Sequence, residues 1–128
     1  MPTPAALPKK DLKKVLIIED EGEMCLLLNI LLDRKQMEVD HVKDLKHAKE
    51  YLETDTPSVV ILDNKLPDGF GVDFVTYIRS NYPQIKIIMI SGFGAAAKDL
   101  ALENGADVFM EKPFSREQLY ESIEKLMN

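Results

Sequence analysis

The chain has 128 residues, of which 45% are hydrophobic and 30% charged, a length and composition typical of one compact domain with a core. Its formal net charge of −6 argues against a protein that binds nucleic acid through phosphate contacts, because its field would repel the phosphates. The single cysteine excludes an internal disulfide, and the lack of a long apolar run or signal-peptide core predicts a cytoplasmic protein without a membrane span.

The N-terminal segment is predicted to be a flexible tail. It contains Pro2, Pro4 and Pro8 followed by several lysines, and it shows no hydrophobic periodicity. We therefore expect a tail over residues 1–13 and a single domain over residues 14–128.

The domain begins with a predicted buried strand, the continuous apolar run Val15–Ile18. Glu19, Asp20 and Glu21 follow it, and adjacent carboxylates repel one another unless solvent, a cation or a base lies nearby. Taken alone, these acids are more simply explained as the start of the next helix, where negative charge suits the helix dipole. That helix is predicted over Glu23–Lys35 from the helical spacing of its leucines.

A second strand–helix unit has weaker signals. Met37–Val42 alternates between more and less polar residues, which is typical of a strand at the edge of a sheet. Asp44 is a suitable N-cap for a helix that extends to about Thr54, with Ala48 and Leu52 on its inner side.

The strongest strand signal is Val59–Asp63, in which four apolar residues run directly into a carboxylate. The turn-forming segment Asn64–Gly69 then breaks the pattern. Asp63 is therefore expected at the carboxyl end of a central strand, the edge at which open α/β sheets bind ligands. In isolation, an aspartate that starts a turn or caps a helix is the simpler explanation.

The next unit contains a helix that starts after Gly69 and ends near Asn81. The fourth strand is predicted over Ile85–Ile90 and ends at Ser91. A hydroxyl at a strand end can hydrogen-bond an anion, although an ordinary strand-to-loop serine is again the simpler explanation.

The fourth helix is predicted over Gly94–Asn104, with Ala97, Leu100 and Ala101 on its inner face. Gly105 fits the residue that terminates such a helix in a left-handed conformation. The apolar stripe is thin, so we expect a less firmly held element.

The fifth strand is predicted over Asp107–Met110, and Lys112 follows it. Ser115 and Gln118 have the spacing of a capping box at the start of the last helix, which buries Leu119.

Five alternations of strand and helix predict an α/β fold, with a parallel sheet, helices on both faces and right-handed crossovers. All the strand carboxyl ends then lie at one edge. That edge collects Glu19, Asp20, Asp63, Ser91 and Lys112. Clustered carboxylates suit Mg²⁺, a lysine can pair with an anion, and a carboxylate can act as a nucleophile toward phosphorus.

With these residues, the sequence resembles the receiver domain of two-component response regulators. The resemblance covers about residues 14–127 and rests on five segments in this order: Glu19-Asp20, Val59–Asp63, Leu66–Gly69, Ser91-Gly92 and Lys112–Phe114. It implies a doubly wound, flavodoxin-like fold whose five-stranded parallel sheet has the strand order 2-1-3-4-5, as in the chemotaxis-type stand-alone receiver.

The resemblance also implies a function, that of a signalling phosphoacceptor rather than an enzyme with a separate substrate. Asp63 would accept a phosphoryl group from a histidine kinase or phosphotransfer protein in a reaction that depends on Mg²⁺ or Mn²⁺. The metal ligands would be Glu19, Asp20, Asp63 and the backbone carbonyl of Lys65. The output would pass to a downstream protein, without nucleic acid or membrane contacts, from a monomer or a phosphorylation-dependent dimer.

Three further residues would bind the phosphoryl group or report its presence. Ser91 would move toward the phosphoryl group, and Lys112 would pair with it. Phe109 lies where the family has its switch aromatic, but it has no hydroxyl, so its two states would differ only in packing. The switching surface would be formed by the helix after Ser91, the fifth strand and the last helix.

Three competing functions have different requirements. A phosphatase of the haloacid-dehalogenase type needs an acid two residues after its nucleophile, where this chain has Lys65. A flavodoxin-like cofactor site needs a phosphate loop rich in small polar residues, where this chain has the acidic run Glu19–Glu21. A receiver-like docking module that works without phosphorylation remains the alternative, and either a stand-alone regulator or part of a longer one fits the sequence.

Three positions depart from the commoner family pattern: Glu19 is longer than the usual aspartate, Lys65 places a cation beside the site, and Phe93 is bulky. Lys65 and Phe93 flank the site at positions that influence the lifetime of the phosphoryl group in this family. A bulky Phe93 is expected to shield that group from water and to slow self-dephosphorylation.

We predict that Phe93→Ala shortens the lifetime of the phosphorylated protein, because water then reaches the phosphoryl group more easily. The measurement is the rate of phosphate loss after the donor has been removed. An unchanged or longer lifetime would contradict the shielding hypothesis.

Overall fold

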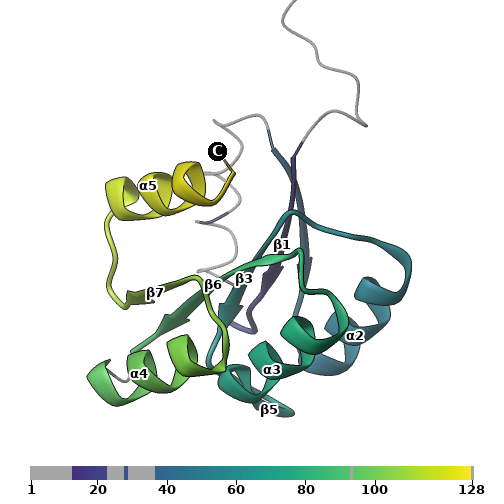
Figure 1. The fold of residues 1–128 in the computed structure, drawn as a ribbon, viewed down its shortest axis with the longest axis horizontal. Coiled ribbons are helices and arrows are strands. Elements are labelled where there is room, and N and C mark those ends of the chain that lie inside the picture. Colours follow the sequence, from purple (N-terminus) through teal and green to yellow (C-terminus); the bar gives the residue numbers. More distant parts are fainter. Residues whose placement is uncertain (1–12, 23–27, 29–36, 93, 128) are drawn as a thin grey trace, which may run out of the picture.

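A computed structural model describes residues 13–22, 28, 37–92 and 94–127 (Figure 1). Its main feature is a five-stranded parallel sheet with the strand order β2-β1-β3-β6-β7. The strands of this sheet are β1 (Lys14–Ile18), β2 (Glu38–Val42), β3 (Val59–Asp63), β6 (Lys86–Ser91) and β7 (Val108–Glu111). The predicted parallel sheet and its strand order are confirmed.

Helices lie on both faces of the sheet. They are α2 (Leu45–Thr54), α3 (Gly71–Asn81), α4 (Gly94–Asn104) and α5 (Arg116–Met127). The first three cover one face and α5 lies on the other (Figure 1). The helix predicted over 23–35 lies outside the described residues except for Leu28, which is buried on the α5 face. Among the described helices, none has the length and apolar character needed to cross a bilayer.

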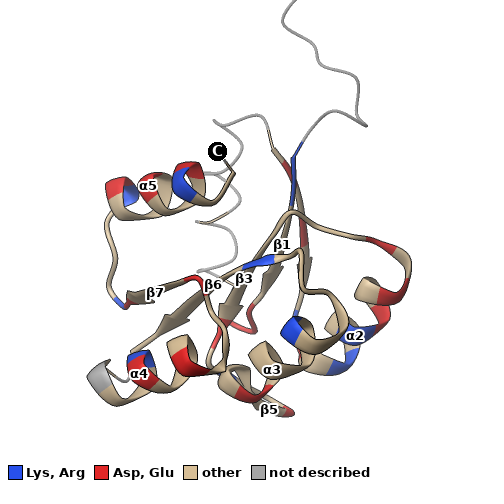
Figure 2. Cartoon of the chain, viewed as in Figure 1, with Lys and Arg blue, Asp and Glu red and all other residues tan. Residues whose placement is uncertain are grey.

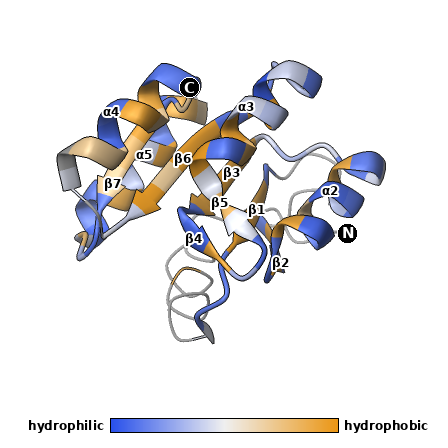
Figure 3. Ribbon diagram, turned by 90° about the horizontal axis from the view of Figure 1, so that it is seen from below, coloured by the Kyte–Doolittle hydropathy of each residue, from blue (hydrophilic) through white to orange (hydrophobic). Residues whose placement is uncertain are grey.

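The continuous apolar runs are explained by burial on both faces. In β1, Leu16 and Ile18 pack in the core beneath α2, α3 and α4, whereas Val15 and Ile17 pack beneath α5. All four side chains are fully buried. Because successive side chains of a strand point to opposite faces, a strand covered on both sides has no polar positions until it ends. Figure 3 shows these hydrophobic strands between helices that carry more hydrophilic residues.

The predicted helix start at Asp44 is confirmed. The Asp44 carboxylate accepts a hydrogen bond from the backbone N–H of His47 at 2.8 Å, which satisfies one of the free amides of the first turn. Ala48 and Leu52 are buried as expected. The strand β2 lies at the edge of the sheet, and each of its residues is half-buried.

A short hairpin after β3 was not predicted. It consists of β4 (Lys65–Leu66) and β5 (Gly69–Phe70), which pair antiparallel. Strands of two residues are too short to show a period in the sequence, so the segment reads only as a turn.

The expected inner face of α4 is partly wrong. Ala101 is fully buried and Ala97 is half-buried, but Leu100 is 47% exposed. Neighbouring residues of a helix lie about 100° apart, so a face centred near Ala101 turns Leu100 toward solvent. Among the described side chains of α4, Ala101 is the one that is fully buried in the core beneath the helix.

The C-terminal part follows the expectations closely. Gly105 has φ +115°, the left-handed conformation predicted for the residue that ends α4. Ser115 Oγ accepts from the Gln118 N–H at 3.1 Å, and Gln118 Oε1 accepts from the Ser115 N–H at 2.8 Å. This is the predicted capping box of α5. Leu119 is buried beneath that helix.

The close approach of α3 to the end of β3 generates a prediction about Gly71. A Cβ atom at Gly71 would clash with the backbone oxygen of Asp63 and would lie 3.1 Å from Asn64 Cα. We expect Gly71→Ala to lower the free energy of unfolding by about 1–3 kcal/mol, the usual cost of overpacking. Gly22→Ala is the control, because its Cβ meets nothing within 4 Å. Equal stability of both variants in urea titrations would contradict this packing argument.

Candidate functional site

Three carboxylates converge at the carboxyl ends of β1 and β3. Glu19 and Asp20 follow β1, and Asp63 is the last residue of β3. One ligand oxygen of each lies within 4.8 Å of the others. The side chains of Glu19 and Asp63 are buried, with 2% and 5% exposure, while Asp20 is exposed. The parallel register of β1 and β3 therefore produces the acidic cluster that the sequence predicted. Figure 2 colours the acidic and basic positions along the ribbon.

Lys112 faces these acids. Lys112 follows β7, and its Nζ lies 3.4 Å from Asp63 Oδ1 and 3.8 Å from Glu19 Oε2. The backbone N–H of Lys112 donates to the Ser91 carbonyl oxygen at 2.9 Å. The end of β7 is thereby fixed beside the end of β6, and the ammonium group is directed over the carboxylates.

These groups line a cavity of about 510 Å³ that opens to solvent. Its lining includes Asp20, Asp63, Ser91 and Lys112, together with Glu21 and residues of the loop after β3. Ser91 is the last residue of β6 and is 1% exposed. The expected convergence of strand-end residues is thus present in the structure, with Glu19 buried just beneath the opening.

Burial changes the acidity of these groups. Desolvation raises the pKa of Glu19 to about 7, and the negative charge of Asp63 acts in the same direction. Desolvation also raises the pKa of Asp63, because the opposing attraction of Lys112 offsets it only in part. Burial works to lower the pKa of Lys112, but the nearby carboxylates outweigh it and the net pKa is raised. Lys112 is therefore charged. Its attraction does not offset the cost of burying the charges of Glu19 and Asp63.

Asn64, which the sequence did not single out, holds the loop after Asp63. Its backbone N–H donates to the Ile90 oxygen at 3.1 Å, and its backbone oxygen accepts from the Gly71 N–H at 2.6 Å. Its side-chain Oδ1 accepts from the Val72 N–H at 3.1 Å. The loop is thus tied to β6 and to the start of α3. Lys65, the next residue, has an exposed side chain.

Two contacts of Glu19 were also not predicted. Its Oε1 accepts from the Glu21 backbone N–H at 2.8 Å, and its carbonyl oxygen accepts from His41 Nε2–H at 2.7 Å. Glu21, interpreted from sequence as a helix start, therefore also lines and shapes the site. The contact of His41 depends on the pairing of β1 with β2 and has no local sequence signal.

Phe109 lies on β7 opposite Met89 of β6. Its side chain is half-buried and packs against the core beneath α2, α3 and α4. Phe93, the proposed shield of the phosphoryl group, lies outside the described residues.

The donor set fits a hard divalent cation. All the acidic ligands offer oxygen, and the exposed Asp20 lies on the solvent side, where a bound ion can keep water molecules. Burial of Glu19 and Asp63 raises the pKa of both, chiefly through desolvation of the charged forms. An additional positive charge would therefore stabilise the ionised pair.

The raised pKa of Glu19 predicts a pH dependence of stability in the metal-free protein. Above its ordinary pKa of 4.5, Glu19 is ionised in the unfolded chain but keeps its proton in the folded one until about pH 7. The folded state then binds more protons, so this contribution to the free energy of unfolding falls as the pH rises from 4.5 to 7. Asp63 acts in the same direction above its ordinary value of 3.8.

The measurement is the difference in unfolding free energy between the wild type and Glu19→Gln, taken in a chelator at several pH values. We expect the wild type to lose stability relative to the variant between pH 4.5 and 7. A constant difference across this window would show that Glu19 titrates normally.

Comparison with known proteins gives concordant matches. Residues 15–124 match the response regulator receiver domain. The response regulator protein PilR of Pseudomonas aeruginosa is 34% identical over 112 residues, which cover 87% of this chain and 25% of PilR. The alkaline phosphatase synthesis transcriptional regulatory protein PhoP of Bacillus subtilis is 31% identical over 121 residues, which cover 90% of this chain and 48% of PhoP. The chain thus spans about a quarter to a half of these relatives.

A solved structure agrees with these sequence matches. The beryllofluoride-activated NtrC4 receiver domain dimer has a TM-score of 0.85 and 33% identity, and the match covers 90% of this chain and 96% of that one. The resemblance inferred from the motifs is confirmed. By its sequence, its parallel sheet and the place of its acidic pocket, this chain belongs to the family of response regulator receiver domains.

Proposed function

We propose that this domain accepts a phosphoryl group on Asp63 from a histidine kinase or phosphotransfer protein, in a reaction that requires Mg²⁺. Receiver domains act with histidine kinases, and they bind Mg²⁺ at an acidic pocket. The observation that carries the proposal is the Lys112 ammonium, 3.4 Å from the Asp63 carboxylate within the acidic cluster. That arrangement suits a dianionic phosphoryl group accompanied by a divalent cation.

The reaction would proceed by attack of an Asp63 oxygen on the phosphorus of a phosphohistidine. A P–O bond forms and the P–N bond breaks, and its electron pair returns to the imidazole, which takes up a proton. The product is an acyl phosphate on Asp63. Lys112 would then neutralise charge on the phosphoryl oxygens, since its Nζ already lies 3.4 Å from Oδ1 of the attacking Asp63 carboxylate.

The remaining site residues would bind either the metal ion or the phosphoryl group. Glu19, Asp20, Asp63 and the backbone carbonyl of Lys65 would hold Mg²⁺, and Mn²⁺ accepts similar oxygen ligands. The bound ion supplies positive charge toward the phosphoryl oxygens. Ser91 would donate its hydroxyl hydrogen to one of these oxygens.

The signal would leave through the surface formed by α4, β7 and α5. The backbone hydrogen bond from Lys112 to Ser91 joins the ends of β7 and β6. A shift of either residue would therefore displace both strands. Phe109 lies on β7 and can change its packing without losing a hydrogen bond, because it has no hydroxyl. On α4, Leu100 and Leu102 are 47% and 41% exposed and are available to a partner protein.

We propose a cytoplasmic signalling domain over residues 14–128 that follows an N-terminal tail. The solved NtrC4 relative is described as a beryllofluoride-activated dimer. By analogy, phosphorylation of this chain would favour contact with a downstream protein or with a second copy. The net charge of −6 disfavours nucleic-acid binding by this domain. The alternative, a docking module that works without phosphorylation, keeps the same surface but not the chemistry.

The test is the intact mass after incubation with acetyl phosphate and Mg²⁺. We expect a gain of one phosphoryl group in the wild type, because Asp63 is accessible from the cavity and paired with Lys112. Asp63→Asn, which keeps the shape but removes the nucleophile, should show no gain. Omission of Mg²⁺ should abolish the gain in the wild type.

A gain of the same size in Asp63→Asn would assign the modification to another residue. No gain in the wild type, either with acetyl phosphate or with a phosphorylated histidine kinase, would favour the docking module. A fluoroberyllate titration followed by the chemical shifts of Ser91 and Phe109 adds a readout that does not require transfer.

A further inference from the structure

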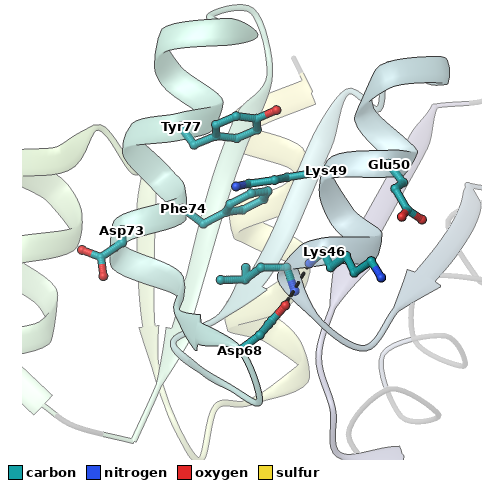
Figure 4. A pocket seen from close by; sticks show the side chains of 8 residues that line it. Lys46, Lys49, Glu50, Asp68, Asp73, Phe74 and Tyr77 are labelled. Carbon is teal, nitrogen blue, oxygen red and sulfur yellow. Dashed lines mark hydrogen bonds between the residues drawn. The ribbon is translucent and has the colours of Figure 1, made fainter.

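Asp68, an exposed residue at the tip of the β4–β5 hairpin, makes two long-range hydrogen bonds to α2. Its Oδ1 accepts from the Leu45 backbone N–H at 2.9 Å, and its Oδ2 accepts from the Lys46 backbone N–H at 3.0 Å. Figure 4 shows the carboxylate directed at the first turn of α2, at one end of the groove between α2 and α3. Both oxygens of one side chain thus bind a helix more than twenty residues away.

Helix capping alone does not require this arrangement. The first four amides of a helix lack partners within it. In α2, the Asp44 side chain and backbone oxygen accept from His47 and Ala48, which leaves Leu45 and Lys46. Exposed amides can be satisfied by water, so the specific effect of Asp68 is to fix the hairpin relative to α2. The negative charge at the helix N-terminus strengthens both bonds.

The tip of the hairpin has few other anchors. A pair of two-residue strands is not stable by itself. Leu66 is buried, but Pro67 is exposed and the Phe70 side chain is 54% exposed. Gly69 also lies close to α2, because a Cβ added there would lie 3.0 Å from Leu45 Cδ1. Glycine at φ +154° permits this close approach, and Asp68 secures it.

The same hairpin contains the backbone carbonyl that the proposed metal site uses. Lys65 lies between Asn64, which is bound to the start of α3, and Leu66, which packs in the core. Within the hairpin, Lys65 pairs with Phe70 and Leu66 pairs with Gly69. Through the pairing of Lys65 with Phe70, a displacement of the tip would move the strand that contains Lys65. Substitution of a residue that orients a metal ligand commonly weakens metal binding by about tenfold or more.

We propose that Asp68 is a positioning residue for divalent-cation binding, which clamps the β4–β5 hairpin to α2 and so holds the Lys65 carbonyl at the acidic pocket. This inference rests on the proposed function, since it assumes that the pocket binds Mg²⁺. It assigns to Asp68 a role that its distance from the carboxylate cluster does not suggest. It also makes the first turn of α2 sensitive to metal binding.

The test compares Asp68→Ala with Asp44→Ala by Mg²⁺ calorimetry of the whole chain. Both variants remove a carboxylate that caps the first turn of α2, but only Asp68 belongs to the hairpin and so links it to α2. We expect the Mg²⁺ dissociation constant to rise by about tenfold in Asp68→Ala and to stay at the wild-type value in Asp44→Ala. Asp68→Asn keeps one acceptor oxygen and should lie in between, and it replaces Asp68→Ala if that variant does not fold.

Amide chemical shifts provide a second readout that capping alone would not change. In the wild type, Mg²⁺ should shift the amide signals of Leu45 and Lys46 together with that of Lys65. In Asp68→Ala, the response of the two α2 amides should disappear while those of Asp20 and Asp63 remain.

The outcomes separate the inference from the function on which it rests. Equal Mg²⁺ affinity in the wild type and Asp68→Ala, or an equal loss in Asp44→Ala, would overturn the role of Asp68 and leave the receiver chemistry intact. Failure of the wild type to bind Mg²⁺ would instead overturn the proposed metal site, and the role of Asp68 with it.

Discussion

Glu19 and Asp63 are buried close together at the carboxyl edge of the sheet, where the ammonium of Lys112 lies 3.8 Å from Glu19 and 3.4 Å from Asp63. Buried charges are costly unless they are paired, which explains why the pKa values of both acids are raised. The two ionised acids therefore destabilise the domain by itself. An added positive charge in the pocket would reduce this cost. This constraint links the fold to the proposed chemistry, because a divalent cation can relieve the repulsion and prepare the site for a phosphoryl group.

The sheet supplies the rigidity that such a site needs. The strand β3 is buried along its whole length between β1 and β6, and Asp63 at its end pairs with Ile90 of β6. Asn64 continues this support by joining the next residues to β6 and to the start of α3. The glycine at position 71 lets α3 approach the backbone of Asp63. Groups placed in this way need little rearrangement during a reaction.

The helices around the site differ in how firmly they pack on the sheet. The helix α4 buries Ala101 in the core and exposes Leu100, whereas α5 has a complete capping box and buries Leu119 and Ile123. Elements with little buried apolar surface open more readily than the core. A rigid pocket beside a lightly packed helix is a suitable arrangement for a switch. On the other side of the pocket, the bonds of Asp68 extend the rigid region to α2.

The sequence alone determined the five parallel strands, the helices that follow β2, β3, β6 and β7, the burial of the central strands and the gathering of Asp63 and Lys112 at one edge. These features follow from local hydrophobic runs and from the rule that parallel strands end on the same side. Only the tertiary structure decided the outward position of Leu100 and the bond of His41 to Glu19. The clamp of Asp68 on α2 was likewise hidden, because its partners are more than twenty residues away. Periodicity reports the environment of neighbouring residues, whereas such contacts depend on how separate elements pack, and no short-range pattern encodes that packing.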